Sequence, residues 1–487
     1  MAARLSREKV SAVDTAWLRM DRPQNLMMIC GVLLFRERVD VDRLKRLVEE
    51  RFLVFRRFRQ RPKEMAGFSV WEADRAFDID RHVVHAPLPG RAGRRELEAL
   101  VSRLIATPLD RHRPMWQFHL ADNYDGGSAL VARIHHCYAD GMALVRVMLS
   151  MTDAGPGGPP AMPFEPRARP DDENDGSGID ALMQPLAGVM KGVRRIATML
   201  IERGTGIWSD PAQAVALANQ GSLLTAEIAK LALMGQDSPT RFKGAVGIEK
   251  RVAWAEPLSL DEVKTIGKAL AASVNDVLLS CVAGALRRYL IGKGEPVEGV
   301  TIRALVPVNL RPLDQAYRLG NHFGLVFLDL PIGIENPVER LYAVRANMNA
   351  LKGSYQPVVA MGLLAAMGAG PRVLQELLLQ LLARNASGVM TNVPGPPKHL
   401  YMAGARIEGL MFWVPQSGDI GMGVSIISYA GEVRFGLVTD RKLCPDPEHV
   451  IARFGPEFEN LLLTTLMSRW PREGDLDPAE AEAAVAA

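Results

Sequence analysis

The chain has 487 residues, of which 48% are hydrophobic and 23% charged, with a formal net charge of +3. This composition is typical of a globular protein with substantial cores, and the length indicates two to four domains. Basic and acidic residues are mixed along the chain, so it lacks the concentrated basic face that nucleic-acid binding requires. No nucleic-acid partner is therefore expected.

Cysteine usage and glycine patterns indicate neither a metal nor a bound cofactor. Cys30, Cys137, Cys281 and Cys444 lie far apart and form no C-x-x-C pair, which argues against a clustered zinc site and favours a reduced, cytosolic protein. The glycine-rich nucleotide-binding patterns are absent. The first ten residues are charged and carry no apolar h-region, so no signal peptide is predicted.

A linker divides the chain. Residues 152–178 include a Gly/Pro-rich run at 155–160 and an acidic run at 171–173, a composition that packed elements do not show. We therefore predict five segments: an N-terminal domain over 1–151, this linker over 152–178, a helical connecting region over 179–245, a C-terminal domain over 246–470, and a flexible tail over 471–487.

In the N-terminal domain the sequence predicts a buried strand over 129–134. A helix is expected after Gly141, because apolar residues recur at helical spacing from Leu144 to Met151. Beyond the linker, residues 182–202 form a second amphipathic pattern. Its basic residues, which lie off the apolar side, are Lys191, Arg194 and Arg195.

The C-terminal domain also mixes helices and strands. Ser259, followed three residues later by Glu262, predicts a helix start with a capping box. The predicted strands cover 301–308, 325–330, 422–429 and 432–438. Ala430 and Gly431 are expected to join the last two strands as a hairpin. A closing helix is predicted over 449–466, so both halves belong to the α/β class.

The strongest chemical signal is the heptad from His135 to Gly141, which reads His-His-Cys-Tyr-Ala-Asp-Gly. Adjacent histidines on a strand point to opposite faces, so the two are not expected to grip one metal ion. For an isolated His-x-x-x-Asp the ordinary interpretation is a core histidine beside a helix-capping aspartate. The doubled histidine and the following glycine make this pattern far more specific. Gly141 is expected to permit the backbone conformation of a tight turn.

This heptad resembles the H-H-x-x-x-D-G signature of coenzyme-A-dependent acyltransferases. Other segments, in order along the chain from about Ser11 to Phe458, resemble the bacterial wax ester synthase/diacylglycerol acyltransferase family. They are Ser11 to Asp14 (S-x-x-D), Pro114 to Trp116 (P-L-W, with Met in place of Leu), Val274 to Leu278 (N-D), Val306 to Arg311 (V-P-V-S-x-R, with Asn in place of Ser), Gly320 to Gly324 (G-N-x-x-G) and Thr391 to Pro396 (S-N-V-P-G-P).

The resemblance implies that His136 is the general base, with His135 in a supporting role. A hydroxyl attacks a thioester well only when a base removes its proton, and the ordinary histidine pKa of about 6.5 suits that task. No covalent acyl-enzyme is implied, so Cys137 is not expected to be a nucleophile. Asp140 is implied to be structural, paired with Arg311 or Arg303.

Other implied site residues have a local interpretation as well. Asn275 or Asp276 could simply cap a helix, whereas the resemblance also puts this N-D motif in the active site, and one residue can do both. Turn formation likewise gives a local explanation for Asn321, His322 and Asn392, which belong to the substrate-contact set named next. The residues implied to contact substrate are Pro114, Trp116, Asn321, His322, Asn392 and Gly395. The sequence does not identify the donor that stabilises the oxyanion.

The resemblance implies two chloramphenicol-acetyltransferase-like domains with mixed sheets and an active-site tunnel at their interface. Acyl-CoA would enter from one side, and diacylglycerol or a long-chain fatty alcohol from the other. Two alternatives remain: a condensation-type or polyketide-associated acyltransferase that uses a carrier-protein donor, and a non-catalytic lipid-binding protein. Acceptor preference, acyl chain length and oligomeric state stay open.

Lipid substrates make a membrane or lipid-droplet surface an expected partner. No spanning helix is predicted, because the uncharged stretch 358–370 is shorter than the roughly 20 residues required. The next stretch is amphipathic and either packs in the core or lies on a membrane. Its apolar stripe comprises Val373, Leu374, Leu377, Leu378, Leu381 and Leu382, with Arg372, Gln375, Glu376 and Gln380 off it. Together with the basic helix over 182–202, it predicts peripheral attachment at the inner face of the cytoplasmic membrane or on lipid droplets.

Overall fold

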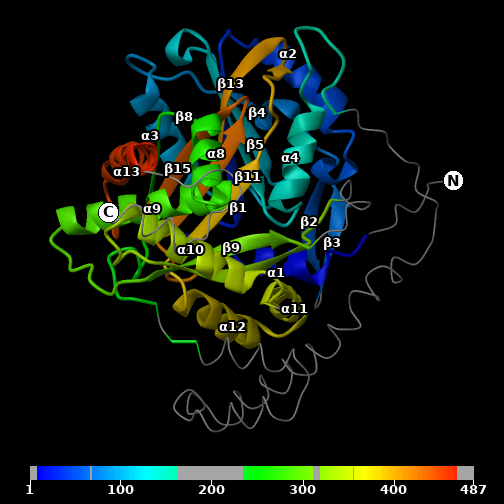
Figure 1. The fold of residues 1–487 in the computed structure, drawn as a ribbon. Coiled ribbons are helices and arrows are strands. Elements are labelled where there is room, and N and C mark those ends of the chain that lie inside the picture. The colour runs from blue at the N-terminus through cyan, green and yellow to red at the C-terminus, as the bar shows by residue number, and fades with distance from the viewer. Residues whose placement is uncertain are drawn as a thin grey trace.

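The computed structural model describes residues 8–65, 68–162, 234–235, 237–310, 319–354 and 356–468. Within them, two mixed sheets carry the fold, and helices pack against both (Figure 1). Most of the predicted linker, the predicted helix over 182–202 with Lys191, Arg194 and Arg195, and the predicted tail lie outside the described residues.

The first sheet has six strands in the order β12-β13-β1-β6-β5-β4. Their bounds are β1 Met28–Phe35, β4 Val83–His85, β5 Trp116–Ala121, β6 Ser128–His135, β12 Tyr401–Met402 and β13 Ala405–Trp413. All eight residues of β6 are buried, which confirms the strand predicted at 129–134. A separate two-stranded sheet joins β2 (Gln60–Met65) and β3 (Phe68–Ala73).

The second sheet runs β10-β9-β11-β14-β15-β7, with β8 paired to β15. Its strands are β7 Lys250–Trp254, β8 Leu258–Ser259, β9 Ile302–Asn309, β10 Phe323–Leu330, β11 Gly388–Pro394, β14 Met422–Tyr429 and β15 Glu432–Asp440. The predicted hairpin is confirmed. Ala430 and Gly431 adopt φ angles of 51° and 85°, as two-residue hairpin turns of type I′ require.

The helices cover these sheets (Figure 1). Their bounds are α1 Ala12–Met20, α2 Val41–Leu47, α3 Arg94–Ile105, α4 Gly141–Ser150, α8 Leu260–Ala269, α9 Val274–Gly292, α10 Pro337–Leu351, α11 Gln356–Ala369, α12 Arg372–Arg384 and α13 Glu448–Met467. Short helical turns lie at Val48–Phe52, Arg56–Arg59, Ile79–Arg81 and Tyr124–Gly126. The predicted helices after Gly141 and over 449–466 are confirmed. Ser259 caps α8 as predicted, accepting a hydrogen bond from the Glu262 amide at 3.3 Å.

Two strands of the C-terminal region, β12 and β13, belong to the first sheet. β13 pairs antiparallel with β1, with Cys30 opposite Trp413. Asp153 and Tyr401, at the start of β12, exchange backbone hydrogen bonds of 2.7 and 3.0 Å. The sheet topology therefore crosses the predicted boundary near residue 246. Local sequence patterns do not show which distant strands will pair, so this exchange was not predicted.

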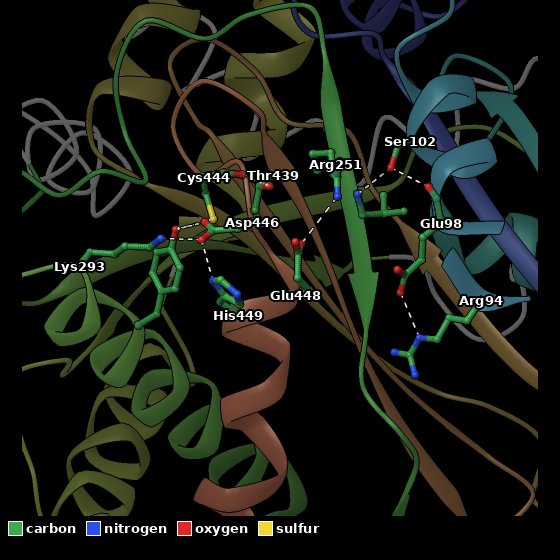
Figure 2. A network of polar contacts seen from close by, with 12 residues as sticks. Arg94, Glu98, Ser102, Arg251, Lys293, Thr439, Cys444, Asp446, Glu448 and His449 are labelled. Atoms are coloured by element: carbon green, nitrogen blue, oxygen red, sulfur yellow. Dashed lines mark hydrogen bonds and ion pairs between the residues drawn. The ribbon is translucent and has the colours of Figure 1, made fainter. Parts of the chain in front are cut away.

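Polar contacts join the two halves along the edge of the second sheet, where β7 lies against α3 (Figure 2). The Val252 amide donates to the Ser102 hydroxyl at 3.0 Å, and that hydroxyl donates to the Glu98 carbonyl at 2.7 Å. Beside them, the Arg251 and Glu448 side chains are 3.9 Å apart. An edge covered in this way is protected from pairing with another chain.

Helix α11 is held between α1 and β10. A Cβ atom built on Gly368 of α11 would lie 1.6 Å from the Ala12 carbonyl oxygen, and one on Gly324 of β10 would lie 2.1 Å from that of Pro357. The Arg19 guanidinium also donates to the Gly370 carbonyl at 2.8 Å. Glycine thus permits a very close approach on both sides, and α1 and α11 lie next to each other (Figure 1).

The predicted apolar stripe of α12 is only partly correct. Leu378 is buried in the core, but Val373 is 61% exposed. Gln375, which was predicted to lie off the stripe, is 4% exposed. Among the described side chains of this helix, the predicted stripe is therefore confirmed at Leu378 and wrong at Val373 and Gln375. Within the described residues no single helix is long and apolar enough to cross a membrane. The pair α8 and α9 meets the length and composition test jointly but bends by 100°.

Candidate active site

Three distant segments meet at His136, which directly follows β6. Its imidazole is buried and stacks on the indole of Trp17 in α1, with ring centroids 4.0 Å apart and an interplanar angle of 16°. The Phe323 ring, at the start of β10, lies 5.5 Å away. A histidine from the first half is therefore enclosed by aromatic rings from the N-terminal helix and from the second sheet.

Burial keeps this histidine neutral. It lowers the pKa of His136 to about 4, although the charge of Asp140, the residue's own carbonyl and Asn321 act in the opposite direction. At neutral pH the imidazole is therefore unprotonated and able to accept a proton. Within the described residues Nδ1 is buried and has no partner at hydrogen-bonding geometry.

Asn321 ties the motif to the N-terminal helix. Its amide nitrogen donates to the Asp14 carboxylate at 2.7 Å and to the His136 carbonyl at 2.8 Å. Burial raises the pKa of Asp14 to about 6, against the lowering effect of hydrogen bonds from Asn321 and Ser11. Both donor hydrogens of Asn321 are thus used inside the protein. In the structure Asn321 therefore holds the histidine motif against α1, whereas the resemblance implied that this residue contacts substrate.

The His135 side chain contacts the Cys137 amide and the Asp21 carboxylate, whereas the His136 ring stacks on Trp17. Its Nδ1 accepts a hydrogen bond from the Cys137 amide at 3.2 Å, and its Nε2 lies 3.8 Å from the Asp21 carboxylate. Burial lowers the pKa of His135 to about 4 despite the opposing charge of Asp21. Burial also raises the pKa of the Cys137 thiol well above its usual range, which disfavours the thiolate that a nucleophile needs.

Asp140 caps α4 and joins it to the second half. One carboxylate oxygen accepts from the Ala143 amide at 2.9 Å, and the other accepts from the His322 amide at 3.0 Å. The predicted partner Arg303 is wrong, since its guanidinium donates to Asp329 across the β9–β10 pair at 2.8 Å. Arg311 lies outside the described residues, so its pairing with Asp140 stays a prediction.

Asp140→Asn is expected to lower stability and activity together. The amide group of asparagine would point one of its N–H donors at the Ala143 or His322 amide, leaving a buried donor unpaired at about 1–3 kcal/mol. Thermal melting and CoA release measured on the same preparation check this. Asp42→Asn, at a side chain 70% exposed, is the matched control and should change neither. Unchanged melting with abolished activity would instead make Asp140 a direct participant.

The predicted reason for Gly141 is wrong. As the first residue of α4 it is not among the residues with positive φ, and a Cβ atom there would meet nothing within 4 Å. The conformation is open to any residue, so no tight turn demands glycine. The local geometry instead leaves open space beside the start of α4.

Pro114 and Trp116 lie in the core of the first half. Trp116 has no exposed surface, and its indole N–H donates to the Phe58 carbonyl at 2.8 Å. Pro114 is buried as well. Between them, the Met115 amide donates to the Tyr138 hydroxyl of the histidine motif at 2.9 Å. Met115 and Trp116 thus support the histidine motif, and the substrate contacts implied for Pro114 and Trp116 stay predictions.

The N-D motif meets the N-V-P-G-P segment. The Asn392 amide of β11 donates to the Asn275 side-chain oxygen at 2.5 Å. The helix cap is Ser273, and Asp276 completes a capping box by accepting from the Ser273 amide at 2.8 Å. Of the two residues in the N-D motif, Asp276 therefore takes part in the helix cap and Asn275 does not. The proximity of Asn275 to the reacting centre stays a prediction.

Gly395 lies beside β14 at very close range. Its amide donates to the Ser428 carbonyl at 2.8 Å, and a Cβ atom on Gly395 would lie 2.3 Å from that oxygen. Glycine at this position permits the close approach of two backbones. His322 contributes its amide to Asp140, as described above. Neither observation tests the substrate contacts that the resemblance implied.

Asn275→Ala is expected to reduce turnover about tenfold, the effect of losing one hydrogen bond that favours the transition state. Melting should change little, because Ser273 and Asp276 cap the helix. Asn392→Ala should reduce turnover by the same factor, and the double variant should turn over as fast as either single variant, because the two side chains share one hydrogen bond. Ser273→Ala is the capping control, costing about 1 kcal/mol of stability with normal turnover. Full activity of Asn275→Ala would limit that residue to a structural role.

Sequence reasoning missed Trp17 and Phe323 as neighbours of His136. Asp14 and Trp17 are three residues apart on α1, so they share a helix face. Placing Asp14 near the motif could therefore have pointed to Trp17 as well. Phe323 lies inside the recognised G-N-x-x-G segment at a position that the pattern leaves unspecified.

Comparison with known proteins agrees with this arrangement. The family model described as the wax ester synthase/diacylglycerol acyltransferase catalytic domain matches residues 10–278, and that of the WS/DGAT C-terminal domain matches residues 319–462. A probable diacylglycerol O-acyltransferase of Mycobacterium tuberculosis is 31% identical over 418 residues. That alignment covers 83% of this chain and 86% of the relative.

Solved structures share the fold. The wax ester synthase/diacylglycerol acyltransferase of Marinobacter aquaeolei VT8 superposes with a TM-score of 0.67 at 22% identity, over 94% of this chain and all of that one. A starter condensation domain of rhizomide synthetase superposes at 0.56 with 12% identity, over 96% and 97% of the two chains. The predicted two-domain, acyltransferase-like α/β fold is therefore confirmed, and the chain belongs to the wax ester synthase/diacylglycerol acyltransferase family.

Proposed function

We propose that this chain transfers a long-chain fatty acyl group from acyl-CoA to the hydroxyl of diacylglycerol or a long-chain fatty alcohol. The products are triacylglycerol or wax ester, and free CoA. The observation that carries the proposal is the buried, neutral His136, presented by the H-H-x-x-x-D-G motif of a family named for this chemistry.

The proposed reaction is a direct transfer. The acceptor hydroxyl oxygen attacks the thioester carbonyl carbon while His136 takes the hydroxyl proton, which forms an imidazolium and a tetrahedral oxyanion. Collapse of this intermediate breaks the C–S bond and forms the ester. The imidazolium then returns its proton to the leaving CoA thiolate. No acyl-enzyme is required, in keeping with the raised pKa of Cys137.

One assay tests the proposal against its alternatives. Purified protein receives a long-chain acyl-CoA with diacylglycerol, with a fatty alcohol, or with neither, and both free CoA and the ester are quantified. Acceptor-dependent CoA release with matching ester formation supports the proposal. Turnover only with an acyl carrier protein as donor would indicate a condensation-type enzyme. Acyl-CoA binding without any turnover would indicate a lipid-binding protein.

We also propose that the protein works at a lipid surface, because the acceptors and products are nearly insoluble. A tunnel between the two halves would admit acyl-CoA from one side and the lipid acceptor from the other. The proposed surface is the inner face of the cytoplasmic membrane or a lipid droplet, held by peripheral contacts that include the basic residues of 182–202.

Flotation with anionic liposomes tests this attachment. Wild-type protein is expected to float at low salt and to sink at high salt, because screening weakens the attraction. Glutamate replacing Lys191, Arg194 and Arg195 together should weaken binding on the order of 100-fold, since each basic residue near an anionic surface contributes about 1 kcal/mol. The control variant replaces three exposed arginines of the first half with glutamate, at Arg36, Arg38 and Arg46, so that the net charge changes equally. If wild-type protein never floats, lipids reach the site by another route.

A further inference from the structure

Two rings enclose the imidazole of His136, and the closer one belongs to Trp17. The Trp17 side chain is 7% exposed and stacks nearly parallel to His136, whereas the Phe323 ring is more distant and inclined by 44°. The indole nitrogen has no hydrogen-bond partner within the described residues. Packing alone therefore sets the orientation of the indole.

Hydrogen bonds of full geometry hold the backbone of His136, and its ring is also influenced by the residue's own carbonyl and by Asn321. The amide donates to the Met27 carbonyl at 2.8 Å, and the carbonyl accepts from Asn321 at 2.8 Å. A catalytic histidine is usually oriented by a hydrogen bond at its second ring nitrogen. Among the described residues Nδ1 of His136 has no such partner at hydrogen-bonding geometry. The groups stacked against the ring therefore contribute directly to setting its plane.

Helix α1 is built as a firm support for this stack. Ser11 caps it by accepting from the Asp14 amide at 3.0 Å, and the Asp14 side chain is bound by Asn321. Its other end is fixed by Arg19, which donates to the Gly370 carbonyl of the α11 terminus. The close approach at Gly368 leaves α1 little room to shift. Trp17 is thus held from both ends of a short helix.

We propose that Trp17 is a positioning residue for His136. Its indole face holds the imidazole plane in the orientation for proton transfer and keeps water off that face of the ring. The inference rests on the proposed function, and it adds a residue outside the recognised motifs. Asp140, the residue's own carbonyl and Asn321 raise the pKa of the imidazole against the effect of burial, and the neighbouring His135 is coupled to it by charge repulsion.

The test compares Trp17→Phe with Trp17→Leu. Phenylalanine keeps an aromatic face and should stay within about threefold of wild-type kcat, whereas leucine should lower kcat about tenfold with KM for acyl-CoA unchanged. In the leucine variant the acid inflection of kcat/KM should move upward, toward the ordinary histidine value, because water reaches the ring. Leu18→Ala, on the same helix, controls for general loosening of α1 and should keep both kcat and the inflection.

A second measurement needs no turnover. Carbethoxylation of His136 by diethyl pyrocarbonate, resolved by peptide mass spectrometry, should be slow in wild type and Trp17→Phe and several-fold faster in Trp17→Leu. If wild type releases no CoA, the proposed function fails, and this reactivity still decides the role of Trp17. Equal kcat and equal reactivity in wild type and Trp17→Leu would overturn the inference. So would a phenylalanine variant as impaired as the leucine one.

Discussion

His136→Ala is expected to fold and to lose roughly 10²- to 10⁴-fold in CoA release, the usual contribution of a positioned general base. The structure supports so large an effect because His136 is neutral at working pH, and its backbone is held by hydrogen bonds from two directions. Steady-state CoA release with saturating acyl-CoA and diacylglycerol, on protein whose melting has been recorded, measures the loss.

Two other histidines give matched comparisons. His119 of β5 is also buried, and burial lowers its pKa to about 4, but it is not among the rings that meet at His136. His119→Ala should therefore keep near wild-type turnover. His135→Ala should lose stability and activity together, because the Cys137 amide would lose its acceptor. Near wild-type turnover in folded His136→Ala would refute the general-base mechanism.

Local pattern predicted the parts of this molecule that depend on local chemistry. The apolar run before His135, the helical spacing after Gly141 and the Ala430-Gly431 turn each involve neighbouring residues, and each was predicted correctly. The pairing of β13 with β1 joins residues nearly 400 positions apart, as between Cys30 and Trp413. No periodicity encodes such a partner choice, because many strands of similar composition compete for it.

The same distinction separates the predicted and missed features of the site. The motifs identified His136, but its surroundings depend on how α1 and β10 dock, so the stack with Trp17 was invisible in the sequence. Asp276 was ambiguous until the backbone showed Ser273 as the cap. The partner of Arg303 depends on strand register, because the register of β9 and β10 places Arg303 opposite Asp329.

Mild acid is expected to destabilise the folded protein strongly between pH 6.5 and pH 4. Burial lowers the pKa values of His119, His135 and His136 to about 4, whereas an unfolded histidine titrates near 6.5. In that window the unfolded chain binds more protons, so the stability present above pH 6.5 is lost as the pH falls toward 4. At pH 5 each histidine contributes a loss of roughly 2 kcal/mol.

Asp14 acts in the opposite sense, because its pKa is raised to about 6 and the folded state keeps a proton that the unfolded state releases. This offsets about 1.4 kcal/mol at pH 5, so the three histidines and Asp14 together account for a loss of about 4 kcal/mol between pH 7 and pH 5. Urea unfolding at a series of pH values measures it. His119→Gln should shrink the loss by about half while keeping turnover at pH 7, whereas His112→Gln, at an exposed residue, should leave it unchanged. A free energy of unfolding that is flat from pH 7 to pH 5 would show that these histidines are hydrated in solution, and the neutral, desolvated state of His136 would then have to be abandoned.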